Sequence, residues 1–430
     1  METQLADFIR DTAAGREAQA ILRRCVHCGF CNATCPTYQL FGDELDGPRG
    51  RIYQIKQVLE GSEPTAKTRL HLDRCLNCRA CETTCPSGVD YTHLLDIGWD
   101  VVEKRLPRRT GEALVRGLLR NGLTRPAWFG ATLRLAQIVR PILPKSFQAR
   151  IPPSVATAII PGPRHSRRWI LLAGCVQPAM YPNINAAARR VLDQLEIDLI
   201  EAPGAGCCGA IRHHLNDSGG GKEDARRNIS AWWPLLSAGA EGLVMTASGC
   251  GAHVLDYAHQ FENDADYADK AGQVSQVTQD ISTLIAAEAE RLSALLKQCP
   301  PLPESGRKLA FHSPCTLQHG LRVRGVVETL LIAAGYELTP VNDAHLCCGS
   351  AGTYSILQPD IAGQLKRDKL KALMAPAPSA IASANVGCIA HLQADAHVPV
   401  MHWIELIDQR LSLSALNQGR LTTVCNADPR

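Results

Sequence analysis

Long uncharged stretches are missing from this chain of 430 residues. The longest one, residues 169–188, is interrupted by Pro178, Pro182 and Asn183, so we expect no transmembrane helix. The first residues, METQLADFIRDTAAGRE, lack the apolar core of a secretory signal. Both absences favour a chain that is exposed to the cytoplasm.

An excess of charge of one sign is also missing. The sequence has 45 basic and 42 acidic residues, which gives no reason to expect a nucleic acid partner. Aromatic residues are scarce at 5%, but hydrophobic residues reach 45%, as in ordinary globular proteins. The glycine-rich segment GGGK at 219–222 lacks the spacing of a phosphate-binding loop. We therefore expect a soluble protein of several domains.

Cysteine, by contrast, is abundant, with 18 residues in the chain. In the reducing cytoplasm such cysteines stay mostly as thiols, so their density indicates metal binding or catalysis before disulfides. Two near-copies of one pattern, CVHCGFCNATCP at 25–36 and CLNCRACETTCP at 75–86, account for eight of them. Both copies have the spacing C-x2-C-x2-C-x3-C-P that is typical of two-cluster ferredoxins.

The spacing predicts two [4Fe–4S] clusters with crossed ligands. Three thiolates two residues apart wrap one face of a cluster, and the fourth, before the proline, points to the other cluster. The expected ligands of the first cluster are Cys25, Cys28, Cys31 and Cys85, and those of the second are Cys75, Cys78, Cys81 and Cys35. Zinc is the alternative, but it does not explain a third cysteine and the x3-C-P ending in both copies.

The surroundings of these loops are expected to be helical. Residues 4–24 and 49–60 carry apolar side chains at helical spacing. We therefore assign residues 1–100 to an α-helical ferredoxin-type module that holds both clusters.

Residues 101–165 differ from the module in composition. Between 101 and 150 there are eleven basic residues and only two acidic ones, interleaved with leucines and aromatics. We interpret the segment as a basic amphipathic linker, which either packs on its own domains or meets a membrane surface or an acidic partner.

A second duplication fills the rest of the chain. In each copy a cysteine is followed after 31 residues by a CCG motif, and then by a cysteine in the motif G-C-x-A-H. The first set is Cys175, Cys207, Cys208 and Cys250, and the second is Cys315, Cys347, Cys348 and Cys388. We predict two homologous cysteine-rich domains, residues 166–300 and 301–430.

Each copy has an α/β pattern. Apolar runs of strand length, at 169–173, 197–200, 243–246, 309–312, 338–341 and 380–384, alternate with helical segments such as 184–195 and 360–374. Because the carboxyl ends of parallel strands meet at one edge of a sheet, the four thiols of each copy are expected to converge. Whether these thiols bind metal, as additional iron–sulfur centres, stays open.

Four other residues recur or stand apart. His253 and His391 follow the last cysteine of each copy by three residues, and we expect them to be hydrogen-bonded polar residues rather than ligands. Cys299 and Cys425 fall outside every pattern.

Two ferredoxin-type motifs followed by a duplicated CCG unit resemble the iron–sulfur subunits of bacterial respiratory dehydrogenases. The chain is most similar to the glycolate oxidase iron–sulfur subunits in two segments, RCVHCGFCNATCPTYQLFGDELDGPRGRIYQIK and LDRCLNCRACETTCPSGVDY. The resemblance implies an electron-transfer subunit of a dehydrogenase for glycolate, and also D-lactate, with FAD-containing partner subunits. It further implies quinone or a membrane surface as the electron exit, and a peripheral position on the cytoplasmic face of the inner membrane.

Alternatives remain at this stage. The chain also resembles iron–sulfur subunits of anaerobic glycerol-3-phosphate and lactate dehydrogenases, and it could instead be a catalytic reductase of disulfides or quinones at the repeats. In the related heterodisulfide reductases each repeat ends in C-x2-C, whereas Ala247 and Asn385 stand at that position here. Each repeat thus keeps four thiols, which argues against heterodisulfide chemistry.

Overall fold

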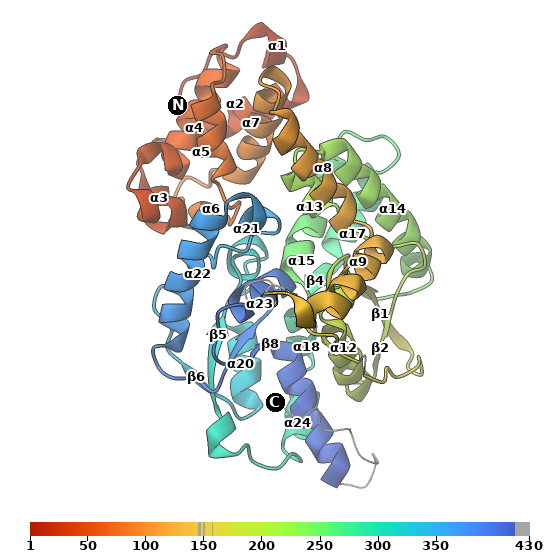
Figure 1. Ribbon diagram of the computed structural model, residues 1–430. Helices are drawn as coiled ribbons and strands as arrows, with labels where there is room; N and C mark the ends of the chain where they lie inside the picture. Colours follow the sequence, from red (N-terminus) through yellow and green to blue (C-terminus); the bar gives the residue numbers. More distant parts are fainter. Residues whose placement is uncertain (145–147, 149–150, 157, 418–430) are drawn as a thin grey trace.

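The computed structural model contains one helical module and two α/β domains (Figure 1). It describes residues 1–144, 148, 151–156 and 158–417. Cys425 lies outside the described residues.

The helical module comprises residues 1–105. Its helices are α1 (Asp7–Arg10), α2 (Ala13–Arg24), α3 (Pro36–Phe41), α4 (Pro48–Leu59), α5 (Ala66–Asp73), α6 (Ala80–Thr84) and α7 (Tyr91–Arg105), with 3₁₀ turns at Phe30–Thr34 and Glu44–Asp46. Thr12 begins α2 because its side chain accepts a hydrogen bond from the Gly15 N–H. The expected helix over 4–24 is therefore interrupted before Ala13. Leu22, Ile55 and Leu94 are fully buried where α2, α4 and α7 pack together.

Two further helices follow the module and run along the first α/β domain (Figure 1). These are α8 (Thr110–Leu123) and α9 (Pro126–Val139), with a 3₁₀ turn at Arg140–Ile142. Pro126 is the first residue of α9, because a proline fits the first turn of a helix. Neither helix buries any residue completely.

The first α/β domain is built around four strands. They are β1 (Arg167–Leu172), β2 (Ile197–Ile200), β3 (Gly242–Met245) and β4 (Thr278–Asp280). Its helices are α11 (Gln177–Met180), α12 (Pro182–Gln194), α13 (Ala210–His214), α14 (Ser218–Ser237), α15 (Ser248–Leu255), α16 (Tyr257–Gln260), α17 (Ala268–Gln276), α18 (Ile281–Ala287) and α19 (Ala289–Leu296).

The second α/β domain repeats this plan. Its strands are β5 (Lys308–His312), β6 (Glu337–Thr339), β7 (Ala380–Ser383) and β8 (Val400–His402). Its helices are α20 (Val326–Ala333), α21 (Tyr354–Leu357), α22 (Pro359–Met374), α23 (Val386–Gln393) and α24 (Trp403–Asn417), with a 3₁₀ turn at Glu304–Gly306 and a π-helical turn at Thr316–Gly320.

Among the described residues the two sheets are four-stranded, wholly parallel and identical in topology. Their strand orders are β2-β1-β3-β4 and β6-β5-β7-β8. The six predicted strands are present with ends that differ by no more than two residues, and the duplication of the fold is confirmed. Sequence reasoning missed the edge strands β4 and β8, because the short segments Thr278–Asp280 and Val400–His402 contain few apolar residues.

The two α/β domains share one hydrophobic core. Trp403 and Ile407 of α24 belong to the same buried cluster as Leu192 and Ile197 of the first domain. Arg190 of α12 forms an ion pair with Asp408 of α24 at 2.6 Å. The repeats thus pack directly against each other.

The helical module rests on the first repeat through ion pairs. Asp256 forms an ion pair with His93 of α7 at 2.9 Å, and His213 forms another with Asp96 at 2.9 Å. In the part of the chain that the structure describes, no helix is both long and apolar enough to cross a membrane.

Candidate metal centres

The two ferredoxin-type loops have the same backbone course. His27 and Gly29 in the first loop, and Asn77 and Arg79 in the second, have positive φ values of 59°, 89°, 49° and 59°. These left-handed residues lie between the cysteines and turn the chain sharply there. Both loops therefore curl in a way that directs successive cysteines toward one point.

Cys25, Cys28, Cys31 and Cys85, here called the first quartet, lie together around one cavity. Cys85 comes from the second loop and joins three cysteines of the first. Burial, and then the neighbouring Cys25, raise the pKa of Cys31 to about 11.

Cys75, Cys78, Cys81 and Cys35, the second quartet, line an adjacent cavity. Here Cys35 comes from the first loop. Burial and then neighbouring thiols raise the pKa values of Cys75, Cys78 and Cys81. The structure thus brings together the two crossed sets of four that the spacing predicts.

The second quartet is surrounded by hydrogen-bond donors. The Arg51 guanidinium lies 3.9 Å from the Cys35 sulfur, measured from Nη1 to Sγ. The Tyr91 hydroxyl and the Asn77 N–H donate to the Cys75 sulfur at 3.6 and 3.4 Å. Such donors stabilise thiolates and tune the centre that thiolates hold.

The chemistry of these sites fits an iron–sulfur cluster. All the cysteines among the described residues are free thiols. Four thiolates in one place repel each other, and a cationic cluster removes that repulsion. The described groups with three ligand atoms within 4.8 Å, the spacing that suits a single ion, contain none of these eight cysteines. Wider spacing is what a four-iron cube requires, because each thiolate binds a different iron.

The two quartets differ in their surroundings. Cys28 of the first quartet is exposed, and its neighbours Val26 and Phe30 are 69% and 62% exposed. The second quartet faces the second repeat. Cys78 packs against the cluster of buried residues that contains Cys315 and Cys347. One centre therefore lies near the surface and the other lies inside the molecule.

Hydrogen bonds fix the contact between the second quartet and the second repeat. The Thr83 hydroxyl, from the loop between Cys81 and Cys85, is bonded to His319 Nδ1 at 2.9 Å. The Tyr354 hydroxyl donates to the backbone oxygen of Arg74 at 2.9 Å.

The four thiols of the first repeat converge at the carboxyl edge of their sheet. Cys175, Cys207, Cys208 and Cys250 form a chain of neighbouring thiols. Hydrogen bonds from Cys175 and Cys208 lower the pKa of Cys207, and the pKa values of both partners rise as a result. Gly209, at φ 94°, leaves no room for a side chain, since a Cβ there would meet the backbone oxygen of Gly221 at 2.7 Å.

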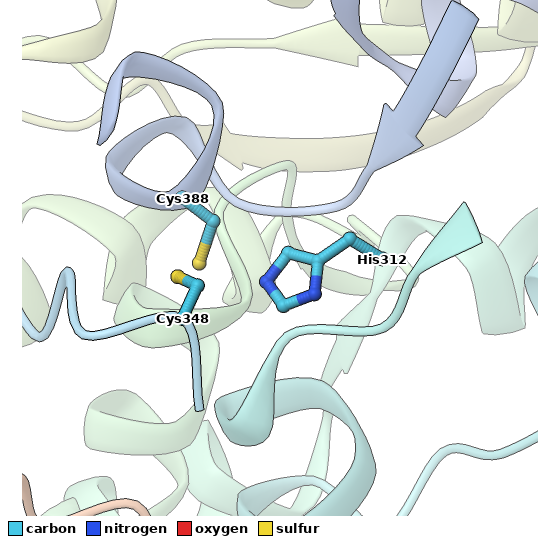
Figure 2. A group of neighbouring side chains, drawn as sticks. All are labelled: His312, Cys348 and Cys388. Carbon is cyan, nitrogen blue, oxygen red and sulfur yellow. The ribbon is translucent and has the colours of Figure 1, made fainter. Parts of the chain in front are cut away.

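The four thiols of the second repeat also lie together. The sulfurs of Cys315 and Cys347 are 3.8 Å apart, and the thiol of Cys348 interacts with both Cys347 and Cys388. His312, the last residue of β5, points its ring at Cys348 and Cys388 (Figure 2).

Of the two histidines outside these quartets, one has the hydrogen bond that the sequence predicts and the other does not. His391 is hydrogen-bonded to the Ala362 oxygen at 3.4 Å, as expected of a polar residue with a partner. The same expectation is wrong for His253, whose buried Nε2 has no partner among the described residues. The Asn385 amide donates to the Cys388 sulfur at 3.5 Å, so the residue that replaces a fifth cysteine still contacts the site.

Sequence reasoning missed His312 and Arg51 altogether. His312 directly follows the apolar run LAF, and Arg51 lies within an otherwise largely apolar helical face. A charged or titratable residue at an expected core position was the available signal.

Comparisons with known proteins agree with this architecture. Residues 21–89 match the family described as 4Fe-4S dicluster domain, and residues 169–254 and 309–393 each match the family described as cysteine-rich domain. The glycolate oxidase iron-sulfur subunit of Escherichia coli is 52% identical over 412 residues, which is 96% of this chain and 99% of that protein.

More distant relatives have the same character. A probable glycolate oxidase iron-sulfur subunit of Bacillus subtilis is 29% identical, over 86% of this chain and 88% of that protein. The lactate utilization protein A of Bacillus velezensis is 26% identical over 56% of this chain and 98% of that protein.

Proposed function

The chain belongs to the family of glycolate oxidase iron–sulfur subunits, and we propose that it transfers electrons released by glycolate, and also by D-lactate, from FAD-containing partner subunits toward the respiratory chain. The proposed ligands of the first [4Fe–4S] cluster are Cys25, Cys28, Cys31 and Cys85, and those of the second are Cys75, Cys78, Cys81 and Cys35.

The observation that carries this proposal is the arrangement of the two quartets. They lie side by side, with Cys81 lining both cavities. One quartet opens at the surface, where Cys28 is exposed, and the other is covered by the second repeat. Electrons therefore have a short route from a partner at the surface into the interior.

When bound, a [4Fe–4S] cluster accepts and returns one electron at a time. The residues of the chain hold the clusters, donate hydrogen bonds to the thiolates and exclude water. At the second quartet the hydrogen-bond donors are Arg51, Tyr91 and Asn77. Substrate oxidation requires a flavin, and the sequence contains no dinucleotide fingerprint after a strand, which supports a separate flavoprotein.

Helices α8 and α9 are the proposed attachment surface. Leu118, Trp128 and Ile138 are 66%, 67% and 75% exposed, which is unusual for such side chains in a free monomer. We propose that partner subunits cover this face and that the assembled complex lies peripherally on the cytoplasmic side of the inner membrane, with quinone as the electron exit.

Metal analysis and co-purification test the proposal together. The anaerobically purified chain should contain the iron and inorganic sulfide of two [4Fe–4S] clusters. Tagged full-length chain should bring down a flavoprotein, and glycolate should then bleach the visible absorption of the clusters. Stoichiometric zinc in place of iron would refute the cluster assignment. Reduction of disulfides or quinones by the chain without any flavoprotein would favour a catalytic reductase instead.

A further inference from the structure

The second repeat contains a buried histidine that the proposed function does not use. His312 is 2% exposed, and neither ring nitrogen has a hydrogen-bond partner among the described residues. A buried polar group without a partner destabilises the folded protein. An imidazole that lacks partners at both nitrogens therefore indicates a ligand.

Two buried thiols face this imidazole. A ring nitrogen of His312 and the sulfurs of Cys348 and Cys388 all lie within 4.8 Å of one another. Figure 2 shows the two sulfurs next to each other, with the His312 ring beside them. The three residues come from three different elements, namely the end of β5, the CCG loop and the first turn of α23.

We propose that His312, Cys348 and Cys388 hold one zinc ion. One imidazole and two thiolates form a donor set that zinc binds readily in tetrahedral sites. The site goes beyond electron transfer, because zinc has no redox chemistry. It ties the carboxyl edge of the second sheet to the CCG loop and to α23.

The spacing of the ligands favours one ion over a cluster. Ligands of a single ion converge, as these three do, whereas the cysteines of the two ferredoxin-type quartets form no group this tight. Cys347, whose thiol interacts with that of Cys348, is a candidate donor for a fourth position.

The surroundings complete the site. Both ring nitrogens of His312 are buried and have no other hydrogen-bond partner among the described residues. The Asn385 amide donates to the Cys388 sulfur at 3.5 Å. The buried Lys369 places a positive charge near Cys347 and Cys348, which offsets part of the thiolate charge. Such outer partners orient ligands in established metal sites.

The first repeat lacks this donor set. Three residues before its first cysteine stands Leu172, at the position of His312 in the second repeat. The other tight groups of potential ligands already have partners of their own. In one, for example, His93 and His259 form ion pairs with Asp256 and Glu17 at 2.9 and 2.7 Å. The proposed zinc site is therefore specific to the second repeat.

Elemental analysis of the full-length chain tests the inference. Wild-type protein purified anaerobically should contain one zinc per chain in addition to its iron. His312→Leu, which copies the first repeat, and Cys388→Ser should each lose that zinc during dialysis against a chelator. We expect affinity to fall by about 10–100-fold or more, the loss seen when even an outer-shell partner is removed. Cys299→Ser serves as the control and should keep the zinc.

Cobalt provides a second measurement. Wild-type protein loaded with Co²⁺ should show absorption from thiolate-to-cobalt charge transfer, which Cys388→Ser should weaken. Iron is measured in the same samples, so the loss of zinc with iron retained separates this inference from the proposed electron-transfer function. Wild-type protein without zinc, with the iron of a third cluster, or with zinc that His312→Leu retains would overturn the proposal.

Discussion

The guanidinium of Arg51 and the sulfur of Cys35 lie 3.9 Å apart in the interior of the helical module, where the Arg51 side chain is 1% exposed. Arg51 also donates to the backbone oxygen of His71 at 2.7 Å and forms an ion pair with Asp46 at 3.5 Å. Its positive charge is thus held rigidly beside the second quartet.

Replacement of Arg51 should make the second cluster harder to reduce. A nearby positive charge stabilises the reduced cluster, which carries one more negative charge. A loss of about 1.4 kcal/mol corresponds to a midpoint potential lower by about 59 mV for one electron. Redox titration of Arg51→Lys and Arg51→Met should show a small shift and a larger one, respectively. Equal potentials in all three proteins would show that the guanidinium does not tune the cluster.

Crossed ligation predicts that two equivalent cysteines have opposite effects. Cys35→Ser should damage the second cluster, and Cys85→Ser the first, because each thiol lies with the other loop's quartet. Electron paramagnetic resonance of the dithionite-reduced proteins should show a signal from each cluster. The signal that changes in the Arg51 variants is assigned to the second cluster, because Arg51 lies beside the second quartet. Cys299→Ser should leave both signals intact. If Cys35→Ser removed the signal that Arg51 variants leave alone, the pairing would be wrong.

Docking of the module on the first repeat should weaken as the pH rises. Hydrogen bonds to Asp256 and Asp90 outweigh the cost of burial and raise the pKa of His93 to about 11; Glu17 and His259 also face its ring. The unfolded value is about 6.5, so the stabilisation is complete below that pH and is lost as the pH approaches 11.

The matched measurement compares wild type with His93→Gln between pH 7 and pH 9. The free energy of unfolding of wild type should fall by up to about 1.4 kcal/mol per pH unit more steeply than that of the variant. Taking the difference removes the contribution of thiols that ionise in both unfolded chains. Parallel curves would show that His93 is not protonated in the folded protein.

Apolar contacts, rather than arginines, should attach the chain to its partner. Arg116 and Arg120 belong to the basic linker, for which an acidic partner was one interpretation. They form ion pairs within the chain instead, with Asp73 and Asp217 at 3.4 and 3.5 Å. Leu118→Glu and Ile138→Glu should each weaken association by about 2 kcal/mol, roughly 30-fold, if the side chain is buried in the complex.

Sedimentation of the complex checks this expectation. The stability of the isolated chain should not change, because both side chains are exposed in it. Arg134→Glu, an exposed charge reversal on α9, is the control and should keep the complex together at high salt. If Arg134→Glu released the chain from the complex and the apolar substitutions did not, the association would depend on charge instead.

The sequence alone determined the features that depend on local spacing. Cysteines two residues apart must share one loop, so the cysteines that lie together in each quartet could be predicted, and the pattern of repeats predicted two α/β domains. The apolar runs of β1, β3, β5 and β7 were equally visible, because buried parallel strands consist of continuous hydrophobic residues.

Only the tertiary structure decided which distant surfaces meet. Nothing near Cys78 in the sequence indicates that it packs against Cys315, since that contact depends on how the whole module is placed on the second repeat. In the sequence His312 is a single histidine at the end of a strand. Only the packing of the sheet and α23 places it beside Cys348 and Cys388. The apolar residues of α8 and α9 fitted a packed linker as well as an exposed face, because periodicity defines a face without saying what covers it.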